Sequence, residues 1–391
     1  MNYVKTRAIY YDSTEIKLDS ILWGLIELGV DVERSDIVSD LVHINEEEAG
    51  LISKEVKNYD FAITQNFNVN VAEGCHDAGV IYISWIYDSP QVALFTDYAK
   101  YSTNYIFCFD KTQCKRLKNL GLPNVFYRPL ASNIVFSSTI DITDEDIRKY
   151  SSDISFIGKM YRINSFSRFS EVASEDVMGK IGKVADRFTG DWKKGTNIYD
   201  SFDKELSDIL VPLVPKSDLE YFTIDPKYIV ETFLLGPSIA QRERSLMLRL
   251  STGIGNTSIY TKEDDMDYAL QNTGANVFPP VWQELPYKVY YSSKISLNLT
   301  LRTIETGVPQ RIFDIMSVGG MVMSNYQEEI PELFDLDKEI VVFHSPEEYL
   351  DKARFYLSHD GLREKIGING YLKVKDKYNY VKSLQNMFSK I

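Results

Sequence analysis

The chain is poor in cysteine and histidine, and this scarcity excludes several kinds of site. Its 391 residues contain three cysteines and four histidines. The cysteines, Cys75, Cys108 and Cys114, form no C-x-x-C pair. Reduced thiols in a cytoplasmic protein are therefore the simplest expectation. The histidines form no H-x-x-x-H pair that a helix could present, which argues against a structural zinc site.

An excess of positive charge and a long apolar run are also missing. The 43 Lys and Arg residues face 56 Asp and Glu residues, for a net charge of −13. A protein that neutralises nucleic-acid phosphates needs a basic face, so we expect no nucleic-acid partner. No apolar run reaches the ~20 residues of a membrane span, and the first residues lack a signal-peptide pattern. We therefore expect a cytoplasmic protein without an integral membrane segment.

Several catalytic motifs are absent as well. The sequence contains no P-loop and no G-x-S-x-G elbow, and its Gly253-x-Gly255 pair precedes a predicted strand, whereas a dinucleotide fingerprint follows one. Three Asp-x-Asp triplets, a pattern that binds metal in some sugar transferases, fall in predicted turns or helix starts, where we interpret them as solvated: Asp144/Asp146, Asp265/Asp267 and Asp335/Asp337. By elimination, the chemistry should come from carboxylates, arginines, backbone amides and helix ends, without a bound metal.

What is present is a regular alternation of short apolar runs and helical patterns. The runs at 8–11, 61–64, 80–86 and 105–109 predict strands separated by helices. This rhythm is typical of an α/β fold with a parallel sheet and helices on both faces. A chain of this length is too long for one hydrophobic core, so two domains are expected.

The domain boundaries follow from composition. We predict a first domain over 1–150, with the polar and acidic stretch 132–152 as linker. A second α/β domain should cover 151–374 and carry a helical insertion at about 165–250. The last amphipathic stretch, 375–391, is expected to be a helix that packs back on the first domain.

The stretch TGVPQRIFDIMSVGGMVMSNY, residues 306–326, combines charge with an apolar pattern. Apolar residues cover most of a helix circumference from Ile312 to Val318, yet Arg311 and Asp314 lie near the start of that helix. The pair Gly319-Gly320 should end the helix and turn the chain into a buried strand. A charged pair near the start of a buried helix fits either a site for a polar ligand or a local surface pair on an ordinary helix.

Residues from about 255 to 385 resemble the C-terminal half of a GT-B glycosyltransferase, in the group containing the spore-maturation protein CgeB. The resemblance lies in NVFPPVWQELPYKVYYSSKISLNLTLRTIETGVPQRIFDIMSVGGMVMSNYQEEIPELF, EIVVFHSPEEYLDKARFYL and LREKIGINGYLKV. The N-terminal half is similar through YISWIYDSP and LGLPNVFYRPLASN. The resemblance implies two Rossmann-like domains facing across a cleft. It places a nucleotide-diphosphate sugar, most simply a UDP-sugar, in the second domain and the acceptor in the first.

The resemblance also implies roles for the 306–326 stretch. The helix N-terminus would face the donor diphosphate, since free N–H groups and the helix dipole favour an anion. Gly307 would let the backbone approach it, and Arg311 would donate to phosphate oxygens. Asp314 would accept hydrogen bonds from the ribose hydroxyls, and Glu305 would lie near the sugar.

Further donor contacts are implied on neighbouring segments of the second domain. A glycine and basic residues after the first strand would face the diphosphate, and the segment around residue 278 would contact the base. Residues after a later strand could touch phosphate or sugar. The candidates are Gly158, Lys159 and Arg162 for the diphosphate, Phe278 and Pro280 for the base, and Asn298, Thr300 and Arg302 for phosphate or sugar.

Two carboxylates of the first domain compete for the role of general base toward an acceptor hydroxyl. Asp88 ends an apolar predicted strand and precedes Ser89-Pro90, so it should lie over the cleft. Asp12 follows the first predicted strand and is the rival. Each also fits a role as a loop or helix cap.

The function expected from these observations is metal-independent transfer of a sugar to a hydroxyl acceptor, such as a surface glycan or protein, with no cofactor besides the donor. Two other functions stay open: a sugar-nucleotide epimerase of the same architecture, and a non-catalytic sugar- or nucleotide-binding module. Release of free diphosphate with a transferred sugar separates the first from both others. A product that remains a nucleotide sugar indicates the epimerase.

Overall fold

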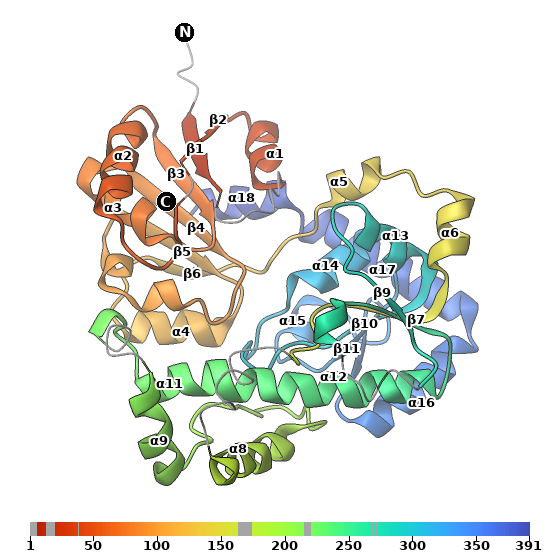
Figure 1. The fold of residues 1–391 in the computed structure, drawn as a ribbon. Coiled ribbons are helices and arrows are strands. Elements are labelled where there is room, and N and C mark those ends of the chain that lie inside the picture. Colours follow the sequence, from red (N-terminus) through yellow and green to blue (C-terminus); the bar gives the residue numbers. More distant parts are fainter. Residues whose placement is uncertain are drawn as a thin grey trace.

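The chain folds into two α/β units, each built on a parallel sheet of six strands (Figure 1). The computed structural model describes residues 6–12, 20–37, 39–162, 174–214, 220–266, 270 and 273–391. Asp267 lies outside these ranges. The first sheet is formed before residue 128 and the second after residue 151.

The first sheet has the order β2-β1-β3-β4-β5-β6. Its inner strands are buried on both faces, which explains why their sequences are almost continuously apolar. Ile83 of β4, for example, lies beside Ile63 of β3 and Tyr105 of β5. The strands are β1 (Arg7–Tyr11), β2 (Asp31–Arg34), β3 (Phe61–Gln65), β4 (Ile81–Ile86), β5 (Asn104–Cys108) and β6 (Val125–Tyr127).

Helices cover both faces of this sheet. Three of them begin at a side chain that caps the first turn: Asn45, Asn68 and Asp110 each accept from backbone N–H groups two and three residues on. The helices are α1 (Ser20–Glu27), α2 (Glu46–Val56), α3 (Val69–Ala78) and α4 (Lys111–Asn119), with the 3-10 turns η1 (Val92–Phe95) and η2 (Asp97–Lys100).

The segment between the sheets contains two helices, α5 (Ile134–Thr139) and α6 (Asp144–Tyr150). The sequence predicted a linker here, and the two helices within it were not expected. Thr143 and Asp146 form a capping box at the start of α6, and Lys288 binds Asp146 at 2.9 Å. Asp144 and Asp146 therefore belong to a helix start, as predicted for this Asp-x-Asp triplet.

The second sheet has the order β12-β11-β10-β7-β8-β9. The chain runs outward from β7 to one edge and then returns to the other side of β7 with β10. Adjacent strands whose connections leave in opposite directions create a crevice at their carboxyl ends, the usual ligand position in such sheets. The strands are β7 (Ser152–Ile157), β8 (Thr257–Tyr260), β9 (Asn276–Phe278), β10 (Ser293–Asn298), β11 (Val322–Asn325) and β12 (Val341–Phe343).

Helices α13 to α17 pack around the second sheet. Helix α14 carries the charged stretch singled out in the sequence, and Gly319, with φ +74°, follows its C-terminus in the left-handed conformation predicted for a helix stop. The helices are α13 (Leu285–Ser292), α14 (Gln310–Met316), α15 (Ile330–Leu333), α16 (Pro346–Leu357) and α17 (Asp360–Lys377), with the 3-10 turn η5 (Glu263–Asp265).

An insertion between β7 and β8 forms its own small helical layer below both sheets in the view of Figure 1. Its apolar core includes Ile181, Leu206 and Leu235. The described elements are α8 (Glu175–Phe188), α9 (Lys204–Leu210), the 3-10 turn η3 (Val211–Leu213), α11 (Pro226–Val230), the π-helical turn η4 (Glu231–Leu235) and α12 (Gly236–Thr252).

The last helix, α18 (Tyr380–Phe388), lies against α1 of the first unit. Phe388 packs edge-on against Phe61 of β3 at a ring-centroid distance of 5.5 Å. The Tyr380 hydroxyl meets the Tyr87 hydroxyl at 2.8 Å. One apolar core thus continues from the first sheet through α18 to α14.

Candidate active site

The carboxyl edge of the second sheet brings three sequence-predicted segments into one row. The strands stand side by side in the order β10, β7, β8, β9. Asn298 ends β10, Gly158 follows β7, and Phe278 ends β9. Neighbouring strands are roughly 4.8 Å apart, so the row spans about 14 Å. An extended ligand of nucleoside-diphosphate size can lie along this edge.

Two arginines converge on Gly158. A Cβ at this position would lie 3.0 Å from Arg311 Nη2 and 3.5 Å from Arg244 Nη1, so glycine lets the backbone approach both guanidinium groups. Arg311 donates to Asn298 Oδ1 at 3.2 Å. The structure therefore brings together three residues expected at the donor site.

Arg244 was not among the residues predicted from the sequence. It lies on α12 with only 4% of its surface exposed, and it donates to the Leu299 carbonyl at 3.1 Å and to the Lys159 carbonyl. Burial lowers the pKa of Arg244 to about 10, and the nearby Arg311 charge acts in the same direction. Two neighbouring cations, one buried and one partly buried, favour an anion between or beside them.

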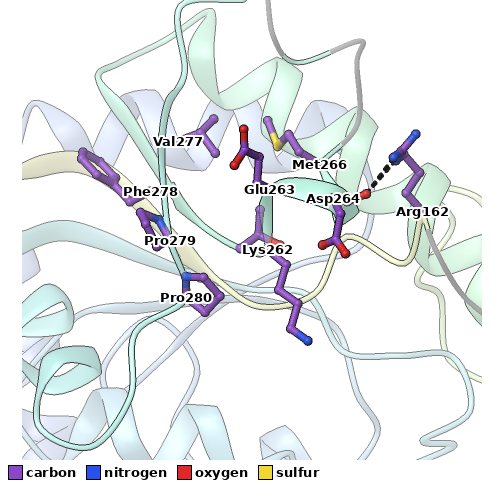
Figure 2. Close-up of a pocket in the computed structure, with 10 residues that line it drawn as sticks. Arg162, Lys262, Glu263, Asp264, Met266, Val277, Phe278, Pro279 and Pro280 are labelled. Atoms are coloured by element: carbon purple, nitrogen blue, oxygen red, sulfur yellow. Dashed lines mark hydrogen bonds between the residues drawn. The ribbon is translucent and has the colours of Figure 1, made fainter.

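A cavity of about 1000 Å³ lies at the ends of β8 and β9. Figure 2 shows Val277, Phe278 and the two following prolines along one side and the loop from Lys262 to Met266 along the other. Val277 and Phe278 remain 41% and 39% exposed. The wall is therefore largely apolar and accessible, as a planar base requires. Thr261 lines the same cavity, and its buried hydroxyl has no hydrogen-bond partner among the described residues.

The loop after β7 is held by an acidic residue of the neighbouring loop. Asp265 accepts from the backbone N–H groups of Met160 at 2.6 Å and Arg162 at 2.7 Å. Arg162 also donates from its side chain to the Asp264 carbonyl at 2.7 Å (Figure 2). Arg162 thus lines the cavity while it braces the loop, and Lys159 is exposed.

In the first unit, Asp88 lies at the carboxyl end of β4 and is exposed to a second cavity. Its Oδ2 accepts from Asn66 Nδ2 at 2.8 Å. Asn66 Oδ1 in turn accepts from the backbone N–H groups of Tyr87 at 2.8 Å and Asp88 at 3.2 Å. Asn66 has φ +64°, a left-handed conformation that asparagine tolerates better than most residues. The whole Asn66 side chain is therefore used to hold the Asp88 loop.

The surroundings adjust the pKa of Asp88. Desolvation by the cavity walls raises the pKa of this carboxyl above its ordinary value. The Asn66 hydrogen bond and the Lys159 charge oppose that rise. Lys159 belongs to the second unit, so its positive charge acts on a carboxyl of the other unit. A cavity-facing carboxylate with a raised pKa suits a general base.

Asp12, the rival to Asp88, has a different environment. Its Oδ2 lies 3.3 Å from Arg34 Nε, and the Asp12 side chain is 12% exposed. Asp12 does not line either of the two cavities described above. The structure thus places only Asp88 of this pair beside a cavity.

Glu305 and Gly307 contact the first unit. Arg116 of α4 binds Glu305 Oε1 at 2.5 Å, and Asn197 donates to Oε2 at 3.2 Å. A Cβ at Gly307 would come within 2.8 Å of the Phe109 ring. Glycine here lets the backbone lie against an aromatic ring of the other unit, whereas the sequence predicted an approach to the donor diphosphate.

Asp314 is enclosed by side chains of α13 and α14. It accepts from Gln310 Nε2 at 2.8 Å. Burial raises the pKa of Asp314 to about 6, while Gln310, Arg311 and Tyr287 oppose the rise. Gln310 also donates to the Ala131 carbonyl at 2.9 Å, so the start of α14 lies against the segment that leaves the first sheet.

Arg302 and Thr300 are occupied within the second unit. Arg302 binds Glu243 at 2.6 Å and donates to the carbonyls of Phe188 and Asp191 at 2.8 Å. The Thr300 N–H donates to Asn325 Oδ1 at 2.7 Å. The structure does not group the Arg302 guanidinium with the Gly158 arginines. Its contacts fix the insertion to the sheet.

The described residues were searched for a metal-binding cluster and for a membrane-spanning helix. No cluster of His, Cys, Asp and Glu that could hold a metal ion occurs within the described ranges. None of the helices in the described part of the chain combines the length and apolar character that crossing a bilayer requires.

Comparison with known proteins places these features in a fold class. Residues 255–389, about a third of the chain, match the model of a family described as Glycosyl transferase-like. No curated protein is significantly similar to the chain.

Solved structures resemble almost the whole chain. HepE from Anabaena, in complex with UDP and glucose, is 9% identical, with 98% of each chain covered and a TM-score of 0.57. A glycosyltransferase from Rickettsia africae is 11% identical, with 99% of this chain and 98% of that chain covered and a TM-score of 0.55. T4 phage BGT with its UDP-glucose substrate is 9% identical, with 98% of each chain covered and a TM-score of 0.52.

At these identities the likeness defines the fold alone. It confirms the predicted fold class: two Rossmann-like domains of the GT-B type. The matched family model lies in the second domain, which carries the arginine pair and the larger cavity.

Proposed function

We propose that the protein is a glycosyltransferase that moves a sugar from a nucleotide-diphosphate sugar to a hydroxyl acceptor. The observation that carries this proposal is the row of groups along the second sheet. Arg311 and Arg244 meet at Gly158, and the apolar cavity opens two strands further along. This arrangement supports a diphosphate at the arginine pair with its base in the cavity. The UDP complexes of HepE and T4 phage BGT are consistent with a UDP-sugar as donor.

The residues suggest how transfer would proceed. The acceptor hydroxyl gives its proton to Asp88 while its oxygen attacks the anomeric carbon of the donor. The bond from that carbon to the phosphate oxygen breaks, and its electron pair leaves with the diphosphate. Arg311 and Arg244 would stabilise the charge that develops there. Lys159 would lie near both the donor diphosphate and the general base, since its charge acts on the Asp88 carboxyl.

Finer expectations from the sequence belong to the same proposal. They are a place in the CgeB-like group, ribose binding by Asp314, and transfer to a surface glycan or protein in the cytoplasm. Because the arginine pair supplies positive charge, we also propose that transfer needs no divalent metal. Activity that persists in excess EDTA would support this, and activity restored only by manganese or magnesium would contradict it.

The decisive experiment measures binding before chemistry. UDP, GDP and TDP are titrated into the protein by calorimetry, and thermal shifts are recorded with UDP-glucose, UDP-galactose and UDP-N-acetylglucosamine. A ligand at a hundredfold excess over its Kd adds about 2.7 kcal/mol of stability. Incubation with a bound donor should then release UDP and transfer the sugar. A donor converted into another nucleotide sugar would show an epimerase, and binding without turnover with any acceptor would show a binding module.

A further inference from the structure

The cavity beside Asp88 has a composition that restricts the acceptor. It has a volume of about 380 Å³ and lies between the domains. This is near the lower end of the range for ligand pockets, so it suits a unit of one or two sugar rings in size. The described residues that line it come from both domains and include Tyr87, Asp88, Gln91, Thr232, Phe233 and Leu301.

Among the described residues that line the cavity, Asp88 alone carries a charge. The others are apolar, aromatic or neutral polar. An anionic group in such a cavity would lose its hydration and face the Asp88 carboxylate, and both effects are unfavourable. Among the described residues, the cation that acts on Asp88 is Lys159, and its positive charge already offsets part of the carboxylate charge. The cavity therefore favours a neutral acceptor.

The far wall is formed by an unusual turn of the insertion. Residues Glu231–Leu235 form a π-helical turn between α11 and α12. Such turns are rare and occur often at functional sites. Glu231 fixes the turn by accepting from the backbone N–H groups of Ser201 at 2.7 Å and Phe202 at 3.0 Å. The turn therefore has a defined position relative to the cavity.

The π-helical turn presents Phe233 to the cavity. Phe233 is 41% exposed although the neighbouring Leu234 and Leu235 are buried. Gly236 follows, where a Cβ would come within 2.5 Å of Thr303 Cγ2. Glycine thus lets the turn approach the β10 side of the cavity. An exposed aromatic ring held by a rigid turn within a cavity indicates a surface for a flat apolar partner.

We propose that the acceptor is a neutral pyranoside whose apolar C–H face packs on Phe233 while one of its hydroxyl groups reaches Asp88. This rests on the proposed function and names its acceptor class. A pyranose ring combines the required features, because one face carries C–H groups and the rim carries hydroxyls. A uronic acid has the same ring but adds a carboxylate, which the Asp88 charge disfavours, and an extended peptide has no such face.

The first test is binding, so that it does not depend on transfer. Methyl β-glucoside, methyl β-glucuronide and an acetylated serine peptide are compared by saturation-transfer difference NMR, with and without UDP. We expect binding of the neutral glucoside, with its ring C–H protons receiving the strongest saturation. Preferred binding of the glucuronide or of the peptide overturns the proposal. Failure of UDP to bind would instead overturn the proposed function, while glucoside binding could still be observed.

The second test assigns the binding to Phe233. Phe233→Ala should weaken glucoside binding about tenfold, the range expected for loss of an aromatic contact. Phe233→Tyr should restore it, because the flat face is retained, whereas Phe233→Leu should not. UDP affinity should stay unchanged in all three. Phe355→Ala is the matched control, since Phe355 is 47% exposed on α16 outside the cavity. Equal glucoside binding in Phe233→Ala and wild type, or equal loss in Phe355→Ala, refutes the role of Phe233.

Discussion

The segment from Asn298 to Asp314 makes contacts in two regions of the molecule, and the two sets of contacts differ in kind. At its two sides, Asn298 and Arg311 contact each other beside Gly158, within the second domain. In its middle, Glu305 and Thr306 contact the first domain: Asp110 accepts from the Glu305 N–H at 2.8 Å and from the Thr306 hydroxyl at 2.9 Å. We call Asn298, Arg311 and the adjoining Arg244 the edge residues, and Glu305 and Thr306 the interface residues.

The two sets differ in which partners their hydrogen-bonding and charged groups have. The interface residues have protein partners in the other domain, so their charge and hydrogen bonds stabilise the contact between domains. The edge residues bring two guanidinium groups together, an arrangement that an anionic ligand would stabilise. Changes to edge residues should therefore alter ligand binding or turnover, and changes to interface residues should alter stability. Three predictions test this distinction and two test the Asp88 site, and they run from the largest expected effect to the smallest.

Asp88→Asn should have the largest effect, on turnover alone. The amide keeps the shape of the side chain but cannot take the acceptor proton, and general bases contribute about 10²–10⁴-fold. We expect kcat for sugar transfer to fall by that factor, with UDP affinity and the melting temperature unchanged. Asp12→Asn is the control and should retain near-normal turnover, since Asp12 pairs with Arg34. The opposite ranking of these two variants would assign the base to Asp12.

Arg116→Ala should destabilise the protein through the interface. It leaves the Glu305 carboxylate, with its side chain 7% exposed, without its cation. Breaking a buried pair costs about 3–5 kcal/mol, and we expect the lower end of that range here because Arg116 is 23% exposed. Denaturant unfolding measures the loss. Lys111→Ala, on the same helix, removes an exposed pair with Glu332 and should cost less than about 1 kcal/mol. Lost UDP binding in Arg116→Ala would place Glu305 among the edge residues.

Glu329 should make the interface sensitive to pH. Thr306 Oγ1 lies 2.7 Å from Glu329 Oε1 and 2.9 Å from Asp110 Oδ1, and one hydroxyl proton cannot serve two ionised carboxylates. Burial raises the pKa of Glu329 to about 7, and the Asp110 charge acts in the same direction. The folded protein thus holds a proton that the unfolded chain releases at a lower pH. The resulting stability is present below about pH 4.5 and is lost as pH rises through about 7.

The measurement is the free energy of unfolding at intervals from pH 5 to 8. Wild type should lose up to about 3 kcal/mol relative to Glu329→Gln over this range, at about 1.36 kcal/mol per pKa unit. The exposed Glu332→Gln variant is the control and should follow wild type. Parallel curves for wild type and Glu329→Gln would mean that Glu329 keeps no proton in the folded protein.

Arg311→Ala and Arg244→Ala should weaken UDP binding without unfolding the domain. A charge-assisted hydrogen bond contributes about 1.5–3 kcal/mol, so each change should raise the Kd of UDP by about one to two orders of magnitude. Calorimetry measures the affinity. Arg242→Ala is the matched control on the same helix, because Arg242 pairs with Asp186 at the surface. If Arg242→Ala weakens UDP binding as much, the effect comes from overall charge.

Asn66→Asp should produce the smallest change, a shift in pH dependence. The new side chain keeps an oxygen for the N–H groups of Tyr87 and Asp88 but replaces the donor to Asp88 with a like charge. The pKa of Asp88 should rise, so the acidic limb of the pH–kcat profile should move to higher pH. Asn66→Gly, which suits the positive φ but has no side chain, separates this from loop disorder. An unmoved acidic limb would show that Asp88 is not the base.

Much of the fold could be predicted from the sequence, because strands buried on both faces are continuous apolar runs and helices end at glycine. The helices at 134–150 were missed, although Thr143 and Asp146 three residues later are a readable capping signal. Arg244 carried no such signal. Its role arises only because α12 returns beneath β7, a long-range packing result that no local pattern encodes.

The site residues were also predictable to different degrees, because long-range packing decides which partner each of them contacts. An arginine or glutamate after a strand has the same sequence signature whether its partner is a ligand or another side chain. Arg302 pairs with Glu243, 59 residues away in the sequence, and Glu305 pairs with Arg116, 189 residues away. Gly158, Arg311 and Asn298 were proposed together through the family resemblance, and the structure places them at one edge of the second sheet.

The insertion has a mechanical consequence for the cleft. Its core belongs to the second domain, yet the Thr223 N–H donates to the Phe95 carbonyl of the first domain at 2.6 Å, and the Tyr221 hydroxyl donates to the Val42 carbonyl at 2.7 Å. Phe233 lies between this attachment and the close contact of Gly236 with Thr303. A hinge motion that separates the sheets must therefore either break the Thr223 bond or carry the π-helical turn along. If the turn is carried along with the first domain, Phe233 and Asp88 stay opposite walls of one cavity while the sheets separate; if the Thr223 bond breaks, that cavity widens.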